Sequence, residues 1–214
     1  MGNLFRVDGK FYTASAKILD MILLALMWVV GCLPVVTILT STASLYHTAV
    51  KCVRYERGKA LEEFVSAYKK NLKQGVGLTV LYGAVGTGIY FFLRFLMAGV
   101  MTGYARLFLL TIGMLVVLLY AMNLQWLIPL FSRLDMSMGA LLQLNYKITV
   151  RYFLRGLLLV LLLAGVAFVC GYLPVGLVIL PPLGMVWASH VAEPVLLKCM
   201  PKSADAESDW RYGG

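Results

Sequence analysis

Charged side chains are missing from long stretches of this sequence. Residues 21–50, 107–132 and 156–192 contain no Asp, Glu, Lys or Arg, and residues 72–93 contain only Lys73. The whole chain is 61% hydrophobic and 14% charged. A soluble globule needs a polar surface over its core, and this composition excludes one. The uncharged stretches instead predict an all-α fold, a bundle of helices that span a membrane.

The sequence also lacks the patterns that usually carry chemistry. The four cysteines are scattered without a Cys-x-x-Cys pair, so they are expected as buried free thiols and not as metal ligands. His190 and Glu193 do not form the His-Glu-x-x-His signature of zinc proteases. No nucleotide-binding or nucleophile motif stands out. We therefore predict a protein that is not an enzyme and that uses no metal or other cofactor.

The lengths of the uncharged stretches predict six spans arranged as three hairpins. A helix rises about 1.5 Å per residue, so a hydrocarbon core of about 30 Å requires about 20 residues. The first and last stretches are long enough for two helices, and each is interrupted by a proline, Pro34 or Pro174, that favours a tight turn. The predicted spans are residues 17–33, 35–53, 74–96, 106–131, 155–172 and 177–197.

The distribution of basic residues predicts the orientation of these spans in the membrane. With six spans and a cytoplasmic N-terminus, all Lys and Arg residues except Arg94 and Arg106 fall on the cytoplasmic side. A five-span alternative, in which one helix runs through Pro34, divides the basic residues less unevenly. Cytoplasmic loops are enriched in Lys and Arg, which favours six spans with both termini in the cytoplasm. The net charge of +9 then follows from topology, and nucleic acid is not an expected partner.

Residues 1–200 are thus predicted to form a single transmembrane domain. The polar residues 201–214 are predicted to be a disordered cytoplasmic tail. Two cytoplasmic connectors, residues 54–73 and 133–155, join the hairpins.

The two connectors share an amphipathic pattern. Apolar residues recur at helical spacing in both, as Leu61, Phe64, Val65, Tyr68 and Leu72 in the first and as Leu141, Leu144, Ile148 and Tyr152 in the second. Basic residues lie on the opposite faces, so each connector predicts an interfacial helix on the anionic inner leaflet. The likeness has two explanations, an internal repeat or convergent composition at the membrane surface.

Charged side chains of the connectors are candidate contacts for a partner protein or for anionic lipid headgroups. They are Arg54, Lys69, Lys70, Lys73, Arg133, Asp135 and Arg151.

Four ionisable residues are predicted in the inner-leaflet half of the spans. They are Asp20, His47, His190 and Glu193. A charge at the centre of a span costs about 2.5–3.5 kcal/mol, so ionisable residues there usually have a function. These four are candidates to line a polar cavity open to the cytoplasm. The alternative is that they lie near span ends, where insertion is cheap.

Uncharged residues within the spans predict contacts between helices. The amides of Asn123 and Gln125 are expected to hydrogen-bond a neighbouring helix. Gly83, Gly86 and Gly88 are expected where two helices approach closely.

Several segments resemble one bacterial family. Gly-x-Leu-Phe at residues 2–5, Cys-Leu-Pro-Val-Val-Thr-Ile at residues 32–38 and Ser-Thr-Ala-Ser-Leu-Tyr at residues 41–46 are similar to the YesL family of membrane proteins, as are residues 63–74 and 129–135. The biochemical function of that family is not established. The resemblance implies a protein of the plasma membrane that accompanies carbohydrate-uptake ABC transporters in Gram-positive bacteria, and it implies no site residues.

Two functional hypotheses follow. The first is a non-enzymatic accessory or regulatory membrane protein that docks sugar ABC transporter subunits or another partner through the connectors. The second is a small transporter or channel, assembled as a homo-oligomer, whose path is lined by the four ionisable residues.

Overall fold

The computed structural model describes residues 10–98 and 103–199 and is helical nearly throughout. The helices are α1 (Lys10–Cys32), α2 (Ile38–Thr48), α3 (Ala60–Met97), α4 (Tyr104–Arg133), α5 (Met138–Arg151), α6 (Phe153–Tyr172) and α7 (Leu180–Cys199). Short 3-10 turns occur at Val35–Thr37 and Pro174–Val178, and a π-helical turn, Ala49–Arg54, follows α2. The predicted all-α fold is confirmed. The predicted tail, residues 201–214, lies outside the described residues.

Three of these helices have the length and apolar composition of a membrane span. They are α3, α4 and α6. Large apolar side chains project outward from the α3–α4 hairpin, where Phe91 is 65% exposed and Phe108 is 67% exposed. Soluble monomers rarely expose apolar surface over long stretches, so this hairpin is suited to contact lipid.

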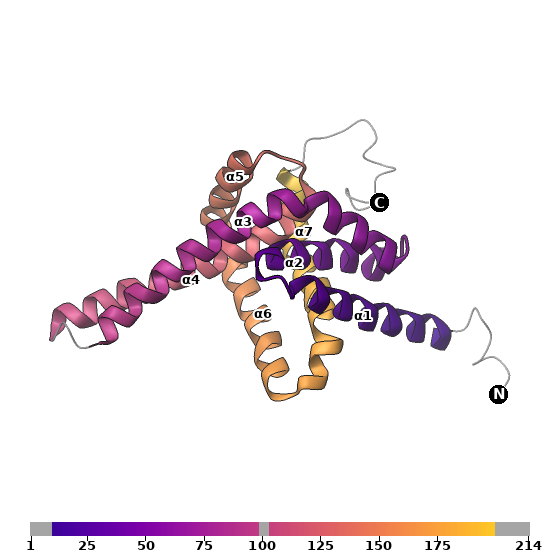
Figure 1. Cartoon of the computed structure of the whole chain (residues 1–214), viewed down its shortest axis with the longest axis horizontal. Coiled ribbons are helices and arrows are strands. Elements are labelled where there is room, and N and C mark those ends of the chain that lie inside the picture. The colour runs from indigo at the N-terminus through magenta and orange to yellow at the C-terminus, as the bar shows by residue number, and fades with distance from the viewer. Residues whose placement is uncertain (1–9, 99–102, 200–214) are drawn as a thin grey trace.

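The hairpins diverge from a common centre (Figure 1). The α3–α4 hairpin extends to one side, the α6–α7 hairpin extends in another direction, and α1 and α2 lie on the side away from the tip of α3–α4. The six-span arrangement, with three hairpins side by side across one membrane, is therefore not confirmed.

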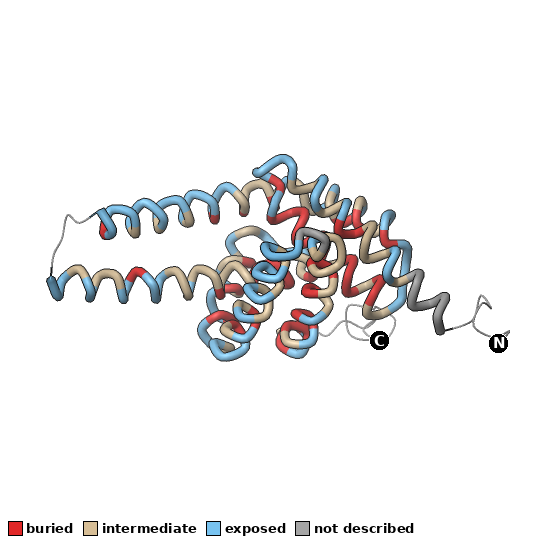
Figure 2. Tube along the Cα trace, turned by 90° about the horizontal axis from the view of Figure 1, so that it is seen from below, coloured by how far each residue is buried: buried red, intermediate tan, exposed pale blue. Residues whose placement is uncertain are grey.

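The core lies where the hairpins meet. Trp126, Leu127 and Leu130 of α4 are buried there with Leu141 and Ile148 of α5. Between helices in a membrane, such side chains contribute through close van der Waals packing. Buried segments gather in this central region, whereas the arms of α3 and α4 are largely exposed (Figure 2).

The first hairpin differs from its predicted position. A Cβ atom added to Gly31 would lie 3.3 Å from Cε2 of Tyr68, and the backbone N–H of Leu39 donates to Thr79 Oγ1 at 3.4 Å. The six-span prediction puts the Pro34 turn at the outer face and Tyr68 at the inner face, about 30 Å apart. In the structure the turn lies beside the first half of α3.

A glycine on α3 permits this close approach. A Cβ atom at Gly75 would lie 2.1 Å from Thr40 Oγ1 and 3.2 Å from the Thr40 Cα atom. The prediction of close helix contact at Gly83 and Gly88 was wrong, because added Cβ atoms there would meet nothing within 4 Å. At Gly86 an added Cβ atom would meet the Tyr120 hydroxyl at 2.8 Å.

The two connectors have different structures. The first is continuous with the third predicted span, because α3 runs unbroken for 38 residues and is about 57 Å long. Its apolar face packs on protein: Phe64 is 3% exposed and belongs to the core cluster of α1 and α2. The second connector is a separate helix, α5, whose predicted apolar face is turned toward the core, as Leu141 and Ile148 are buried.

Candidate functional site

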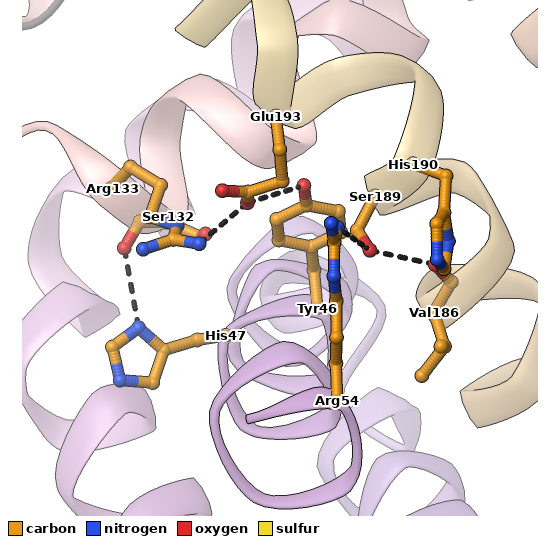
Figure 3. A network of polar contacts seen from close by, with 9 residues as sticks. All are labelled: Tyr46, His47, Arg54, Ser132, Arg133, Val186, Ser189, His190 and Glu193. Carbon is orange, nitrogen blue, oxygen red and sulfur yellow. Dashed lines mark hydrogen bonds and ion pairs between the residues drawn. The ribbon is translucent and has the colours of Figure 1, made fainter. Parts of the chain in front are cut away.

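A buried ion pair joins α4 to α7. Arg133, the last residue of α4, donates from Nη2 to Oε1 of Glu193 on α7 at 2.5 Å, and their side chains are 0% and 3% exposed. The hydroxyl of Tyr46 on α2 donates to the same carboxylate oxygen at 3.1 Å. These three side chains, here called the Arg133–Glu193 network, point toward one another from three helices (Figure 3).

The network pairs two buried side chains of opposite charge, so that neither charge is buried alone. Either charge alone would cost several kcal/mol to remove from water, and their mutual attraction offsets that cost when the geometry is close and hydrogen bonds satisfy the remaining atoms. Tyr46 contributes such a bond and is itself 1% exposed. The network therefore holds the end of α4 and the facing parts of α2 and α7 in one arrangement.

A second polar link lies beside it. Arg54 donates to Ser189 Oγ at 2.7 Å, and Ser189 in turn donates to the Val186 carbonyl at 2.6 Å. The π-helical turn brings Arg54 there, because its wider hydrogen bonding, such as Tyr55 N–H to Val50 O at 3.0 Å, rotates the last residues relative to α2. Arg54 thus connects the first connector to α7.

The structure separates the four predicted cavity residues. Glu193 points into the core, and His47 lies nearby with its Nδ1 3.4 Å from the Ser132 carbonyl oxygen. His190 is exposed, and its Nδ1 lies 2.9 Å from the carbonyl oxygen of Val186 on its own helix. Asp20 on α1 is half-buried. His47 and Glu193 are thus brought to the two sides of residues 132–133, whereas His190 faces away.

The predicted docking residues also divide into two groups. The prediction for Arg133 was wrong, because its side chain is buried in the ion pair and is closed to a partner or a headgroup. Arg54 is half-buried against Ser189. The remaining residues are exposed: Lys69, Lys70, Lys73, Asp135 and Arg151. Among them, Lys70 pairs with Asp135 at 2.6 Å.

A polar cavity lies on the other side of Arg133. Its volume is about 310 Å³, and it is bounded by the end of α2, the π-helical turn, the first turns of α3 and the end of α4. His47, Lys51, Glu63, Lys70 and Asp135 line it. Lys51 and Glu63 form an ion pair at 2.6 Å, and His47 Nε2 lies 4.0 Å from the Glu63 carboxylate.

A separate amide network joins α3, α4 and α5. Asn145 is buried and donates to Tyr82 Oη at 3.1 Å and to Asn123 Oδ1 at 2.9 Å. The hydroxyl of Tyr82 also donates to Asn123 Oδ1. The expectation that Asn123 bonds a neighbouring helix is confirmed. For Gln125, the buried Oε1 atom has no hydrogen-bond partner among the described residues.

Sequence reasoning missed several of these residues. Tyr46, Ser189 and Asn145 are polar residues within apolar helices, and no spacing rule links residues so far apart in the chain. A usable signal existed for one pair: Arg133 and Glu193 carry side chains of opposite charge, and each lies near the C-terminal end of an apolar helix. Within residues 10–98 and 103–199, no group of three His, Cys, Asp or Glu side chains comes close enough to hold a metal ion.

The fold and the buried network define a helical protein with membrane-spanning character. One protein family, described as "Protein of unknown function, DUF624", matches residues 21–93, which are about a third of the chain. The matched segment covers the second half of α1, all of α2 and most of α3, including Tyr46 and the cavity residues His47, Lys51, Glu63 and Lys70. No curated protein and no solved structure matches the chain.

Proposed function

We propose that the chain is a multi-pass protein of the bacterial plasma membrane that acts without catalysis, as an accessory or regulatory component of carbohydrate uptake. Both termini face the cytoplasm in this proposal, and the α3–α4 tip faces outside. The resemblance to the YesL family supports the association with sugar ABC transporters of Gram-positive bacteria. The uneven distribution of Lys and Arg supports the orientation.

The observation that carries the accessory role is the closed centre of the molecule. The Glu193 carboxylate accepts hydrogen bonds from Arg133 and Tyr46. The centre of the molecule is filled by side chains such as Trp126 and Leu127, which are 0% and 1% exposed. A transport path needs polar groups that face water along its length. Of the four ionisable residues, Glu193 is bonded internally and His190 faces outward.

A basic surface supports docking. Lys69, Lys70 and Lys73 are exposed within about one helical turn in the first half of α3, and Arg151 is exposed at the end of α5. Each basic residue near an anionic leaflet adds about 1 kcal/mol of attraction. This surface is suited to an acidic partner segment or to anionic headgroups.

The alternative function is a small oligomeric transporter or channel. The polar cavity of about 310 Å³ beside Arg133 favours it, since a transported solute needs a binding site.

Charge reversal of the basic surface tests the docking role. We expect Lys69→Glu, Lys70→Glu and Lys73→Glu together to abolish crosslinking to the permease subunits of a sugar ABC transporter from the same bacterium. The variant removes three favourable charges from the surface and adds three repulsive ones. Crosslinked permease would be quantified by mass spectrometry after purification of the full-length chain from membranes.

A matched variant, Arg94→Glu with Arg106→Glu, reverses charges near the α3–α4 tip and is expected to leave crosslinking intact. Equal permease recovery with the triple variant and with the unaltered chain would refute docking through this surface.

A further inference from the structure

The polar cavity has the size of a small-molecule site. Its volume of about 310 Å³ lies at the lower end of the roughly 300–1,000 Å³ typical of ligand pockets. Unlike most such pockets, it is lined mainly by charged and hydroxyl side chains. Ser132 is one of them, and its buried Oγ atom has no hydrogen-bond partner among the described residues.

Two ion pairs in the cavity wall lie at different depths below the protein surface. The Lys51–Glu63 pair is the inner one, with side chains 19% and 25% exposed, and the Lys70–Asp135 pair is at the mouth, with both side chains 61% exposed. Glu63 and Lys70 both belong to α3 and are two helical turns apart. They therefore lie on one face of the helix, separated by about 10 Å along its axis.

This arrangement selects for a ligand that carries both charges. Each wall pair is neutral, so a ligand with a single charge would leave an uncompensated charge in a partly buried site, which is unfavourable. A zwitterion adds no net charge. Its ammonium group can donate to Glu63, because a carboxylate accepts several hydrogen bonds and need not release Lys51. Its carboxylate can replace Asp135 at Lys70, since an exposed pair contributes little and exchanges easily.

We propose that the cavity binds a small zwitterion with opposite charges at its two ends, such as a peptide of three residues. An extended chain spans about 3.3–3.6 Å per residue, so three residues match the spacing of about 10 Å between Glu63 and Lys70. A single α-amino acid is too short to reach both. The inference is independent of the accessory role, because binding is measured on the purified chain without a partner.

Calorimetry on the full-length protein in nanodiscs tests the ligand class. We expect saturable binding of L-alanyl-L-alanyl-L-alanine, and loss of binding when its amino group is acetylated or its carboxyl group is amidated. L-Alanine and inorganic phosphate are expected to bind at least about tenfold more weakly, the factor expected for one lost charged hydrogen bond. Equal or tighter binding of the blocked peptides or of phosphate would overturn the proposal, as would an absence of tripeptide binding.

Neighbouring residues on α3 provide matched controls. Glu63→Gln is expected to weaken tripeptide binding by about tenfold or more, because Glu63 is three-quarters buried. Lys70→Gln is expected to weaken it by a smaller factor of about threefold to fivefold, because Lys70 is exposed. Glu62→Gln and Lys69→Gln alter adjacent positions outside the cavity wall, where Glu62 pairs with Lys59, and are expected to leave binding unchanged.

Lys70 is exposed, so Lys70→Gln is not expected to destabilise the fold. This variant therefore still tests the site if Glu63→Gln fails to fold. The double variant Lys51→Gln with Glu63→Gln removes the inner pair without leaving one charge alone and is expected to bind as weakly as Glu63→Gln. Unaltered binding in the Lys70→Gln variant, or equal losses in Lys70→Gln and Lys69→Gln, would refute the site.

Discussion

Arg133 and Glu193 are ionisable side chains that lie in the apolar interior of the protein. Arg and Glu side chains are rarely buried unless they are paired, and both of these are buried among apolar residues of α4 and α7. A buried ion pair contributes little net stability relative to a well-packed apolar pair, but removal of one partner leaves a buried charge. The pair therefore acts mainly to fix which helices meet, with Tyr46 adding a third helix to the contact.

A double-mutant cycle tests this role. We expect Arg133→Met or Glu193→Gln alone to lower the free energy of unfolding by about 3–5 kcal/mol, because each leaves its former partner unpaired. The double variant Arg133→Met with Glu193→Gln is expected to lose less than the sum of the two single changes. Unfolding would be followed by helical circular dichroism in mixed micelles as a denaturing detergent is added.

The exposed pair of Lys59 and Glu62 is the control for this cycle. Their side chains are 80% and 69% exposed, so Glu62→Gln is expected to change stability by less than about 1 kcal/mol. Additive losses in the Arg133 and Glu193 cycle would mean that the two side chains are not coupled.

At the scale of elements, α2 and α3 form the closest helix contact described above. Their antiparallel packing brings Thr40 onto Gly75 and Leu39 onto Thr79, while His47 and Lys51 reach Glu63 near the start of α3. Small residues at such a contact let backbones approach, and van der Waals packing then holds the helices together without a hydrophobic driving force.

Substitution of Gly75 tests the contact. We expect Gly75→Ala to destabilise the protein by about 1–3 kcal/mol, the usual cost of overpacking, because its Cβ would overlap Thr40 and the two helices would have to separate. Gly83→Ala is the matched control: its Cβ meets nothing within 4 Å, and alanine stabilises a helix by up to about 1 kcal/mol relative to glycine. Thermal unfolding in detergent distinguishes the two. A Gly75→Ala variant as stable as Gly83→Ala would contradict the contact.

The first hairpin gives a second test at this scale. Because the Pro34 turn lies beside Tyr68 and Thr79, we expect a cysteine at Val35, in a chain with its four native cysteines replaced, to resist a membrane-impermeant thiol reagent in intact cells. A cysteine at Tyr104, which is 92% exposed at the α3–α4 tip, should react.

A cysteine at Lys59 should react only after permeabilisation, because the first connector faces the cytoplasm in the proposed orientation. External labelling at Val35 as strong as at Tyr104 would support a first hairpin that crosses the membrane, as six spans require.

At the scale of the whole molecule, the closed centre predicts a protein that does not conduct. The three hairpins meet around Trp126, Leu127 and Leu130, and the cavity beside Arg133 is bounded by these packed helices. Among the described residues, the apolar side chains in contact at this centre would strip a permeating solute of its hydration.

Liposomes containing the purified chain are therefore expected to retain an encapsulated sugar and entrapped potassium ions as well as protein-free liposomes do. A pore-forming peptide provides the positive control for release. Release that scales with the amount of the chain would favour the transporter function over the accessory function.

The sequence by itself determined the class of fold, three of the six predicted spans as the helices α3, α4 and α6, and the apolar face of α5, because these depend on local composition and on periodicity within one helix. It also singled out Glu193, His47 and Asn123 as polar residues within apolar helices. It did not determine how the hairpins are arranged. The Pro34 turn carries no charge, so the distribution of Lys and Arg is the same whether or not that hairpin crosses the membrane.

Only the tertiary structure decided which residues meet. The sequence pattern predicts Arg133 as a surface charge, but its side chain is buried opposite Glu193, which lies 60 residues away. The glycine that permits close packing is Gly75 and not Gly83 or Gly88. Such contacts depend on the relative rotation and depth of helices distant in the chain. Many pairings of apolar helices bury similar areas, so periodicity within one helix leaves the choice of partner open, and close packing with paired buried charges makes that choice.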